Sequence, residues 1–306
     1  MSTSTTVLEK NQNDVITLAK SLNVSKETKK LDYKILIDFA LNPANKGLLN
    51  KNFGMFYEYS PLNSLLFSMQ QLSRFGKVLP CANFKTWQKL GYKIKKGEHA
   101  LLGWFPCGGY YITSKDDKGK EQKQYIANRF IFKPIAFSMA STTCDKLDIK
   151  TIDASGFDYK NVIKKLNIDI IDFDASMGSN GNAGGYAFPN KKQIAINPIF
   201  DNGNSENVHT LFHELAHVLL HNDNDIKAIK EFAKNNIELR AIKELEAEMT
   251  AYLIMNTIST KYNTDYSIGY IKNWLSVNPK GFSDISCKRV LSTVNKIVKI
   301  IKELKN

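Results

Sequence analysis

Four of the five histidines of this 306-residue chain lie in one stretch, VHTLFHELAHVLLH, at residues 208–221. They follow one another in steps of four, and such a step advances about 400° around an α-helix, so the side chains stand nearly above one another. His213 and His217, with Glu214 between them, form the pattern HExxH. In this pattern two imidazoles bind zinc and the glutamate acts on the attacking water. The stretch therefore predicts a Zn²⁺ site with Glu214 as the catalytic residue.

The alternative interpretation of these histidines is an ordinary helix that carries them on its surface. The immediate sequence, LFHELAHVLL, is apolar on both flanks, whereas solvated histidines would lie among polar neighbours. Buried histidines without a charge or a metal to balance them are rare. The context thus favours the metal site.

A catalytic zinc site needs a third protein ligand and an open fourth position. The only histidine outside the stretch is His99, in the other half of the chain, so the third ligand is expected to be acidic. The segment KELEAEMTAYL offers Glu244, Glu246 and Glu248. Glu244 and Glu248 share one helix face, and Glu246 points about 160° away. We predict Glu244 as the metal ligand and Glu248 as the partner of a histidine N–H. The alternative is a solvated acidic face.

Structural roles are expected for His209 and His221, which drift about 40° per step away from the metal-facing side. His221 lies beside NDND at the helix end, where a partly cationic imidazole would interact favourably with the helix dipole. His209 could also line the cleft. His209 and Tyr252 are candidates for stabilising the oxyanion of a hydrolytic reaction.

The spacing of apolar residues predicts the elements that must position this chemistry. In the second half we expect a helix running into a strand, a glycine-rich loop with a hairpin, and helices over 205–221, 237–258 and 284–304. The segment GGYAFPNKKQIAINP is expected beside the cleft, able to pair with an extended substrate. The first half is predicted to hold helices near 31–43 and 60–76, a short helix before Gly91, and a long hairpin with the charged tip SKDDKGKEQK.

The predicted fold class is α+β with two domains. A polar stretch without sustained periodicity near residue 150 is the expected boundary. The predicted division is a flexible N-terminus at 1–25, a first domain at 26–150 and a second at 151–306.

Charge is distributed unevenly between the two halves. Residues 1–150 hold 23 Lys and Arg against 12 Asp and Glu, whereas residues 151–306 hold 19 against 18. Because aromatic residues are interleaved with the lysines of the first half, a nucleic acid is the expected polyanionic partner. A lysine-rich solvated surface is the alternative.

Other partner and compartment classes receive no support from the sequence. The four cysteines lack CxxC spacing, so neither a disulfide framework nor a thiolate zinc site is indicated. No apolar run is long enough for a membrane helix and no signal peptide is recognisable, so we expect a cytoplasmic protein without membrane contact.

Binding to single-stranded DNA requires cations along the backbone and flat side chains for base stacking. For Trp87 the core is a strong alternative, because aromatic residues at helix and strand spacing more often belong to the core. Asn63 could equally hold a loop through a hydrogen bond. The predicted DNA-binding residues are Tyr59, Asn63, Lys85, Trp87, Lys89, Lys93, Lys95 and Lys96.

The second half resembles the gluzincin-type metallopeptidases that include the ImmA/IrrE family, through His213, Glu214, His217, Glu244 and Glu248. Residue 248 is Glu where that family usually has Asp or Asn. In the first half, YSPLNSLLFSMQ and FKTWQKLGYKIKKGEHALLGWFP resemble blocks of ArdC-like antirestriction proteins, whose N-terminal domain binds single-stranded DNA. The segment IFKPIAFSMAST departs from the block that these relatives have there.

The resemblance implies a mobile genetic element as the source and an antirestriction function, carried out by a DNA-binding domain joined to a zinc-dependent metallopeptidase. The protein substrate is not specified. Two alternatives stay open: a DNA-bound regulatory peptidase that cleaves a repressor, and a DNA-binding protein whose metal site is structural. An acid between the two histidine ligands argues against the structural site, which has no need of Glu214.

Overall fold

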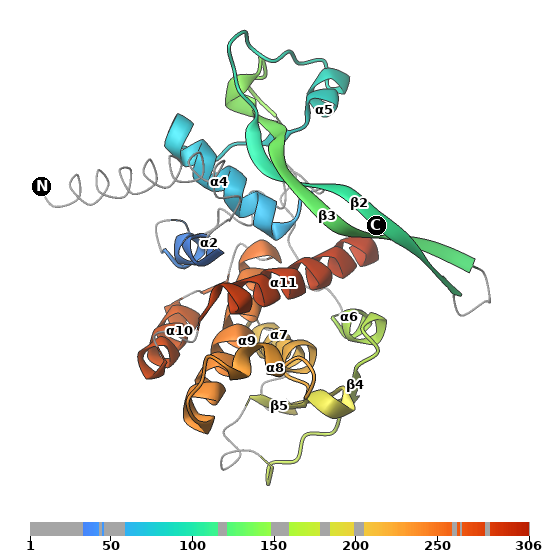
Figure 1. Ribbon diagram of the computed structural model, residues 1–306, viewed down its shortest axis with the longest axis vertical. Helices are drawn as coiled ribbons and strands as arrows, with labels where there is room; N and C mark the ends of the chain where they lie inside the picture. Colours follow the sequence, from blue (N-terminus) through green and yellow to red (C-terminus); the bar gives the residue numbers. More distant parts are fainter. Residues whose placement is uncertain are drawn as a thin grey trace, which may run out of the picture. The chain divides into compact units, whose positions relative to one another are not determined.

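The computed structural model describes residues 33–42, 45, 59–115, 121–147, 159–177, 184–198, 205–258, 262–263, 265–278 and 282–305. The predicted flexible N-terminus at 1–25 lies outside these residues. The described part is α+β: long helices and two three-stranded sheets, one in each of two compact units (Figure 1). This agrees with the predicted fold class.

The two units divide the chain differently from the predicted domains. One unit contains the described part of Leu66–Ile149, and the other combines Val24–Leu65 with Lys150–Asn306. The helix α2 (Tyr33–Leu41) accounts for the difference, because it contacts α11 (Asp284–Lys305) and buries Ile37 and Phe39. The two units are called the hairpin unit and the histidine unit below.

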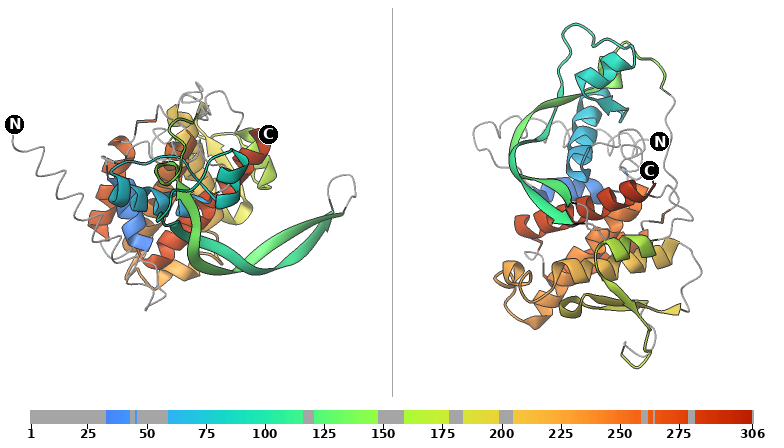
Figure 2. Two further views of the ribbon diagram at one scale, coloured as in Figure 1. Left: turned by 90° about the horizontal axis from the view of Figure 1, so that it is seen from above. Right: turned by 90° about the vertical axis from the view of Figure 1, so that its right-hand side faces the viewer.

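The hairpin unit is built around the antiparallel strands β2 (Leu101–Lys115) and β3 (Glu121–Ser138). Both strands are long, and they twist around each other as a ribbon (Figure 2). The short strand β1 (Cys81–Ala82) pairs with the end of β3, which gives the sheet order β1-β3-β2. The predicted hairpin is confirmed, and residues 116–120 of its tip lie outside the described part.

Two neighbouring glutamines connect α4 (Pro61–Phe75) to the base of this hairpin. Gln70 exchanges hydrogen bonds with the backbone of Leu102, at 2.8 Å from Leu102 N and 2.8 Å to Leu102 O. The Gln71 carbonyl oxygen accepts from the Ser138 hydroxyl at 2.6 Å. Buried amide groups need such partners because an unpaired one costs about 1–3 kcal/mol. The contacts therefore fix the helix against both strands.

The helix α5 (Phe84–Lys89) contributes Trp87, whose side chain is fully buried. The indole N–H donates to the Phe137 carbonyl at 2.9 Å, and the ring meets Tyr92 edge-on. Asn83 begins the helix by accepting a hydrogen bond from the Thr86 N–H. Trp87 therefore anchors α5 on the end of β3.

The histidine unit is organised around α9 (Asn236–Ile258), which contacts α7 (Ser205–Leu220), α10 (Asp265–Val277) and α11 (Figure 1). Every residue of α9 from Leu245 to Ile258 is buried. A helix surrounded on all faces must be apolar, or its polar groups must find partners inside the protein. This requirement applies directly to the acidic residues of α9.

A small sheet lies next to α7, which contacts both β5 (Gly185–Phe188) and β6 (Gln193–Ile196). The sheet order is β4-β6-β5, with β4 (Asp169–Ile171) parallel to β6 and β5 antiparallel to it. The short helices α6 (Lys160–Lys165) and α8 (Lys227–Lys230) complete the described elements of this unit. The predicted hairpin at β5–β6 is thus present, with β5 as an outer strand.

The sequence prediction did not assign α10, although its apolar residues Ile268 and Ile271 are buried against the rest of the unit. Its exposed residue Tyr266 and its half-buried residue Trp274, spread along the helix, weaken the amphipathic pattern. Across the described residues, no helix combines the length and the low polarity that a membrane span requires.

The burial of Trp87 predicts the effect of two aromatic substitutions in α5. Trp87→Phe should lower the free energy of unfolding by about 1–3 kcal/mol, because it leaves the Phe137 carbonyl without its donor. Phe84 is 54% exposed, and Phe84→Ala should change the same quantity by less than about 0.5 kcal/mol. Urea unfolding followed by circular dichroism measures both. Equal destabilisation by the two variants would contradict the core role of Trp87.

Candidate metal centre

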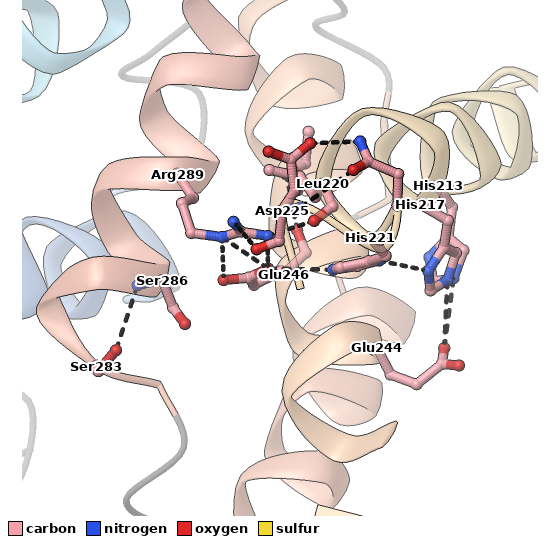
Figure 3. A network of polar contacts seen from close by, with 12 residues as sticks. His213, His217, Leu220, His221, Asp225, Glu244, Glu246, Ser283, Ser286 and Arg289 are labelled. Atoms are coloured by element: carbon pink, nitrogen blue, oxygen red, sulfur yellow. Dashed lines mark hydrogen bonds and ion pairs between the residues drawn. The ribbon is translucent and has the colours of Figure 1, made fainter. Parts of the chain in front are cut away.

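Helices α7 and α9 approach closely because small residues lie between them. Ala216 of α7 and Ala247 of α9 are fully buried and form one cluster with Leu220. The close approach turns the histidine row of α7 toward the acidic residues of α9, as the labelled side chains in Figure 3 show for His213, His217 and Glu244. The helical spacing of the motif is thus confirmed, and packing supplies the partners.

Three potential ligand atoms converge at the face that α7 presents to the start of α9. The Nε2 atoms of His213 and His217 are 3.2 Å apart, and Glu244 Oε2 lies 3.5 Å and 3.8 Å from them. Zinc bonds of about 2.0–2.2 Å in a tetrahedron place neighbouring ligand atoms about 3.3–3.5 Å apart. Two imidazoles and one carboxylate at these separations therefore fit a Zn²⁺ ion, with little rearrangement.

The charges of this cluster are interdependent. Burial acts to lower the pKa of His213, but hydrogen bonds with Glu244 and Glu248 outweigh it and raise the pKa to about 10. Burial acts in the opposite direction on Glu244, yet the hydrogen bond with His213 lowers the pKa of Glu244 to about 2. For His217, burial and the nearby His213 charge hold the pKa well below its usual value. In the protein without metal, a charged His213 thus compensates the carboxylates around it.

Glu214 is buried, with 8% of its surface exposed, and lies on the side of α7 that faces β5. Burial raises the pKa of Glu214 to about 7, against the opposing effect of His213. Gly185 of β5 provides the room for this side chain: a Cβ atom there would stand 3.0 Å from Glu214 Cγ and 2.8 Å from the Ala195 carbonyl oxygen. The glycine is therefore needed for the close contact between strand and helix.

Glu248 lies behind His213, on the side away from Glu244. Its Oε2 atom is 3.0 Å from His213 Nδ1, and the His209 Nε2 atom is 3.1 Å from its Oε1. Burial acts to raise the pKa of Glu248, but the bonds to the two histidines lower it strongly. His209 also contacts Tyr262, with 2.7 Å between the Tyr262 hydroxyl oxygen and His209 Nδ1. His209, His213 and Glu248 also lie close enough together to form a second potential ligand group, but their atoms already contact one another.

A second series of side chains in polar contact begins at His217. Its Nδ1 atom is 2.9 Å from His221 Nδ1, and His221 Nε2 is 3.1 Å from Glu246 Oε2. Figure 3 shows these side chains in one line toward Arg289 of α11. The predicted cationic character of His221 is wrong, because burial and the charge of Arg289 hold its pKa well below the usual value. Glu246 does point away from Glu244, yet it reaches the histidine row through His221.

Tyr252, one of the residues that the sequence suggested for stabilising the oxyanion, does not lie at the site. Tyr252 is buried, and its hydroxyl donates to the Ala40 carbonyl at 2.8 Å, within the core of the unit. Tyr270 of the unassigned helix α10 lies at the site instead, 3.3 Å from Glu244 Oε2 and edge-on to His213. The sequence prediction also missed Tyr262 and Ser267, whose hydroxyl oxygens lie 2.5 Å apart behind His209. No motif marks these residues, since only tertiary packing brings them to α7.

The predicted DNA-binding residues lie in different environments. The five lysines are exposed, and a loop held by the Ile94–Thr142 bridge carries three of them: Lys93, Lys95 and Lys96. Trp87 is fully buried, which differs from the prediction, because a ring without an exposed face cannot stack on a base. Asn63 is buried and Tyr59 half-buried, and both belong to the histidine unit rather than to the hairpin unit.

Comparison with known protein families finds one matching segment in each half of the chain. Residues 40–135 match the N-terminal domain of the anti-restriction factor ArdC, and residues 173–281 match a zincin-like metallopeptidase domain. The chain joins an ArdC N-terminal domain to a zincin-like domain. The second match contains the HExxH motif and Glu244, so this ArdC-like chain has its converging ligand atoms within the zincin-like part.

The individual relatives have low sequence identity to this chain. An uncharacterized protein from Bacillus anthracis is 28% identical in an alignment of 294 residues, and the alignment covers 82% of this chain and 47% of the relative. The chain thus spans about half the length of the curated relative that it matches. The metal-free crystal structure of the antirestriction ArdC protein from the R388 plasmid is 17% identical, with a TM-score of 0.49, and covers 89% of this chain and 96% of that one. For its Mn(II)-bound structure the values are 16%, 0.48, 89% and 98%.

The contact between β5 and Glu214 predicts opposite effects for two glycine substitutions. Gly185→Ala should lower the free energy of unfolding by about 1–3 kcal/mol, because the added methyl group overlaps fixed backbone. Gly269 of α10 has open space around its Cα, so Gly269→Ala should raise the stability by about 0.4–1 kcal/mol. Urea unfolding compares the two variants. A stabilised Gly185→Ala protein would show that the strand does not press on Glu214.

Proposed function

We propose that this chain is an antirestriction-type, cytoplasmic protein that binds single-stranded DNA and hydrolyses a peptide bond with the help of Zn²⁺. The convergence of the His213, His217 and Glu244 ligand atoms carries the enzymatic part of the proposal. The exposed lysines of the hairpin unit support the DNA-binding part. The ArdC and zincin-like family matches agree with this combination.

The chain's residues divide the hydrolytic work according to their positions. His213, His217 and Glu244 would hold the ion, which when bound acts as a Lewis acid toward water and the substrate carbonyl. Glu214 accepts the proton of the attacking water and delivers it to the leaving amine. Glu248 holds the His213 ring through Nδ1, which leaves the Nε2 atom directed at Glu244. Tyr270 replaces Tyr252 as the candidate for stabilising the oxyanion.

An extended peptide is the substrate shape that the neighbouring sheet favours. In the described sheet β5 is an outer strand, and its Gly185 lies against Glu214. The backbone groups on the outer side of such a strand can pair with a further strand. A substrate bound in this way would pass directly beside the catalytic glutamate.

The arrangement favours a catalytic over a structural metal site. A structural zinc site is closed by four protein ligands, whereas the described ligand group here supplies three. Glu214 interacts electrostatically with His213 and Glu244 of this group without belonging to it, as a general base requires.

For the DNA, we propose that the lysines contact phosphates and that exposed rings of the hairpin unit stack on bases. Phe84, Tyr110 and Tyr111 are 54%, 53% and 68% exposed, and each ring is large enough for stacking. These residues take the stacking role that the sequence prediction gave to Trp87. The Lys85 and Lys89 side chains are exposed on α5, the helix that begins with Phe84.

Glu214→Gln separates metal binding from hydrolysis. This variant should keep the Zn²⁺ content of the wild-type protein and lose about 10²–10⁴-fold in peptide hydrolysis, because it removes a general base but no ligand. Glu244→Gln should lose both, whereas Glu248→Gln should retain more metal than Glu244→Gln. Mass spectrometry of dialysed protein measures the metal, and a fluorogenic peptide mixture measures hydrolysis. Unchanged hydrolysis by Glu214→Gln would contradict the proposed mechanism.

Replacement of Lys93, Lys95 and Lys96 by Ala tests the DNA part. If each lysine contacts one phosphate, the slope of log K against log salt for single-stranded DNA should become shallower by about 2. Lys227, Lys230 and Lys234 are equally exposed but lie in the histidine unit, so their triple replacement by Ala is the matched control. Fluorescence anisotropy at several salt concentrations gives both slopes. An unchanged slope for the first variant would exclude this loop as the DNA contact.

A further inference from the structure

Arg289 of α11 lies at the far end of the chain of contacts that begins at His217. Its side chain is 14% exposed, and its guanidinium group contacts Glu246, with Nε at 3.1 Å from Oε1 and Nη2 at 3.2 Å from Oε2. It also donates to two backbone carbonyls, those of Asp225 and of Leu220, the last residue of α7. Arg289 is therefore fixed by several acceptors in addition to Glu246 (Figure 3).

The charge of Arg289 determines the direction of the hydrogen bonds in this chain. A guanidinium group only donates and stays protonated in proteins, so the Glu246 oxygens that face it are acceptors. With Glu246 as a carboxylate, the contact of 3.1 Å to His221 requires that His221 Nε2 carries the proton. A neutral imidazole has one N–H, so His221 Nδ1 is then an acceptor. Its neighbour at 2.9 Å, His217 Nδ1, must therefore donate.

We propose that Arg289 is a positioning residue that fixes the tautomer of His217, acting through Glu246 and His221. A proton on His217 Nδ1 leaves the lone pair on Nε2, which is the atom that faces His213 and Glu244. Hydrogen bonds in the reverse direction would place a proton on His217 Nε2, and this atom could then not bind a metal. This inference rests on the proposed metal site, and it assigns a role to a residue about 70 positions away from the motif.

The burial of these hydrogen-bonded side chains stabilises this direction of the hydrogen bonds. The side chains of His221 and Glu246 are 1% and 0% exposed, so no bulk water competes for their hydrogen bonds. An unpaired buried carboxylate or imidazole N–H would be strongly unfavourable. A rotation of any one ring or carboxylate would break two contacts at once. The ligand histidine is thus held in one orientation as well as in one tautomer.

The test uses the full-length chain, with and without Zn²⁺. Long-range ¹H–¹⁵N spectra of the metal-free protein report which ring nitrogen of each histidine is protonated. In the wild-type protein we expect His217 as the Nδ1–H form and His221 as the Nε2–H form. In Glu246→Gln, the amide group can donate to His221 Nε2, and both tautomers should reverse. Unchanged tautomers in this variant, or a wild-type His217 protonated on Nε2, would overturn the proposal.

Zn²⁺ affinity, measured by competition with a chromophoric chelator, provides the second readout. Loss of a hydrogen-bonding partner behind a metal-ligating histidine typically weakens metal binding about 10- to 100-fold, and we expect this for Arg289→Met and Glu246→Gln. His221→Phe keeps the Arg289–Glu246 pair and the ring volume, so it should fold and show the same loss. Lys296→Met, at an exposed position of the same helix, should bind Zn²⁺ like the wild-type protein.

The two readouts distinguish failure of the inference from failure of the proposed function. If the wild-type protein binds no Zn²⁺, the proposed metal site is wrong, while the tautomers of the metal-free wild type, Glu246→Gln and Arg289→Met still decide whether Arg289 and Glu246 fix the tautomer of His217. If the wild-type protein binds Zn²⁺ and His221→Phe binds it equally well, the relay has no influence on the ligand and the inference is wrong. Thermal unfolding of each metal-free variant verifies that it is folded.

Discussion

The burial of α9 is the constraint on which the rest of the histidine unit depends. A charged group inside a protein is strongly unfavourable unless it is paired and hydrogen-bonded, and α9 carries Glu246 and Glu248 at positions 0% and 2% exposed. Glu248 is paired with His213 of α7, and Glu246 is paired with His221, the residue that follows α7. The close packing of Ala216 and Ala247 permits these contacts. The histidines thus pair with the buried carboxylates of α9. Glu244 is less deeply buried and faces both inner histidines, His213 and His217.

This pairing gives the four-residue repeat of histidines a physical meaning. The inner pair, His213 and His217, directs its Nε2 atoms toward Glu244. The outer pair supports the inner one: His209 braces the carboxylate behind His213, and His221 contacts His217 directly. Both supports end on groups from the C-terminal part of the unit: Tyr262 before α10 and Ser267 of α10 on one side, and Arg289 of α11 on the other. The orientation of the inner pair therefore depends on helices that follow the motif by 40 residues or more.

The hairpin unit follows a different design. Its polar side chains hold the elements together: Gln70 and Gln71 join α4 to the hairpin, and Trp87 joins α5 to β3. The lysines and the exposed rings lie outside these contacts, so they can vary without loss of the fold. The cations on its surface agree with the proposed binding of DNA through its phosphates more than through its sequence.

The sequence by itself determined the motif helix, the acidic helix, the hairpins and the α+β class, because all of these follow from local periodicity and turn residues. It also indicated Glu244 and Glu248, since residues four apart share a helix face. It did not indicate α10, the burial of Tyr252, or the packing of α2 with the second half of the chain, and it left open whether Trp87 belongs to the core. Arg289 is the clearest case: it lies 72 residues beyond His217, in a helix with an ordinary amphipathic pattern. Only the tertiary structure decided its partner, because a buried carboxylate selects the cation that reaches it in space, whatever the distance along the chain.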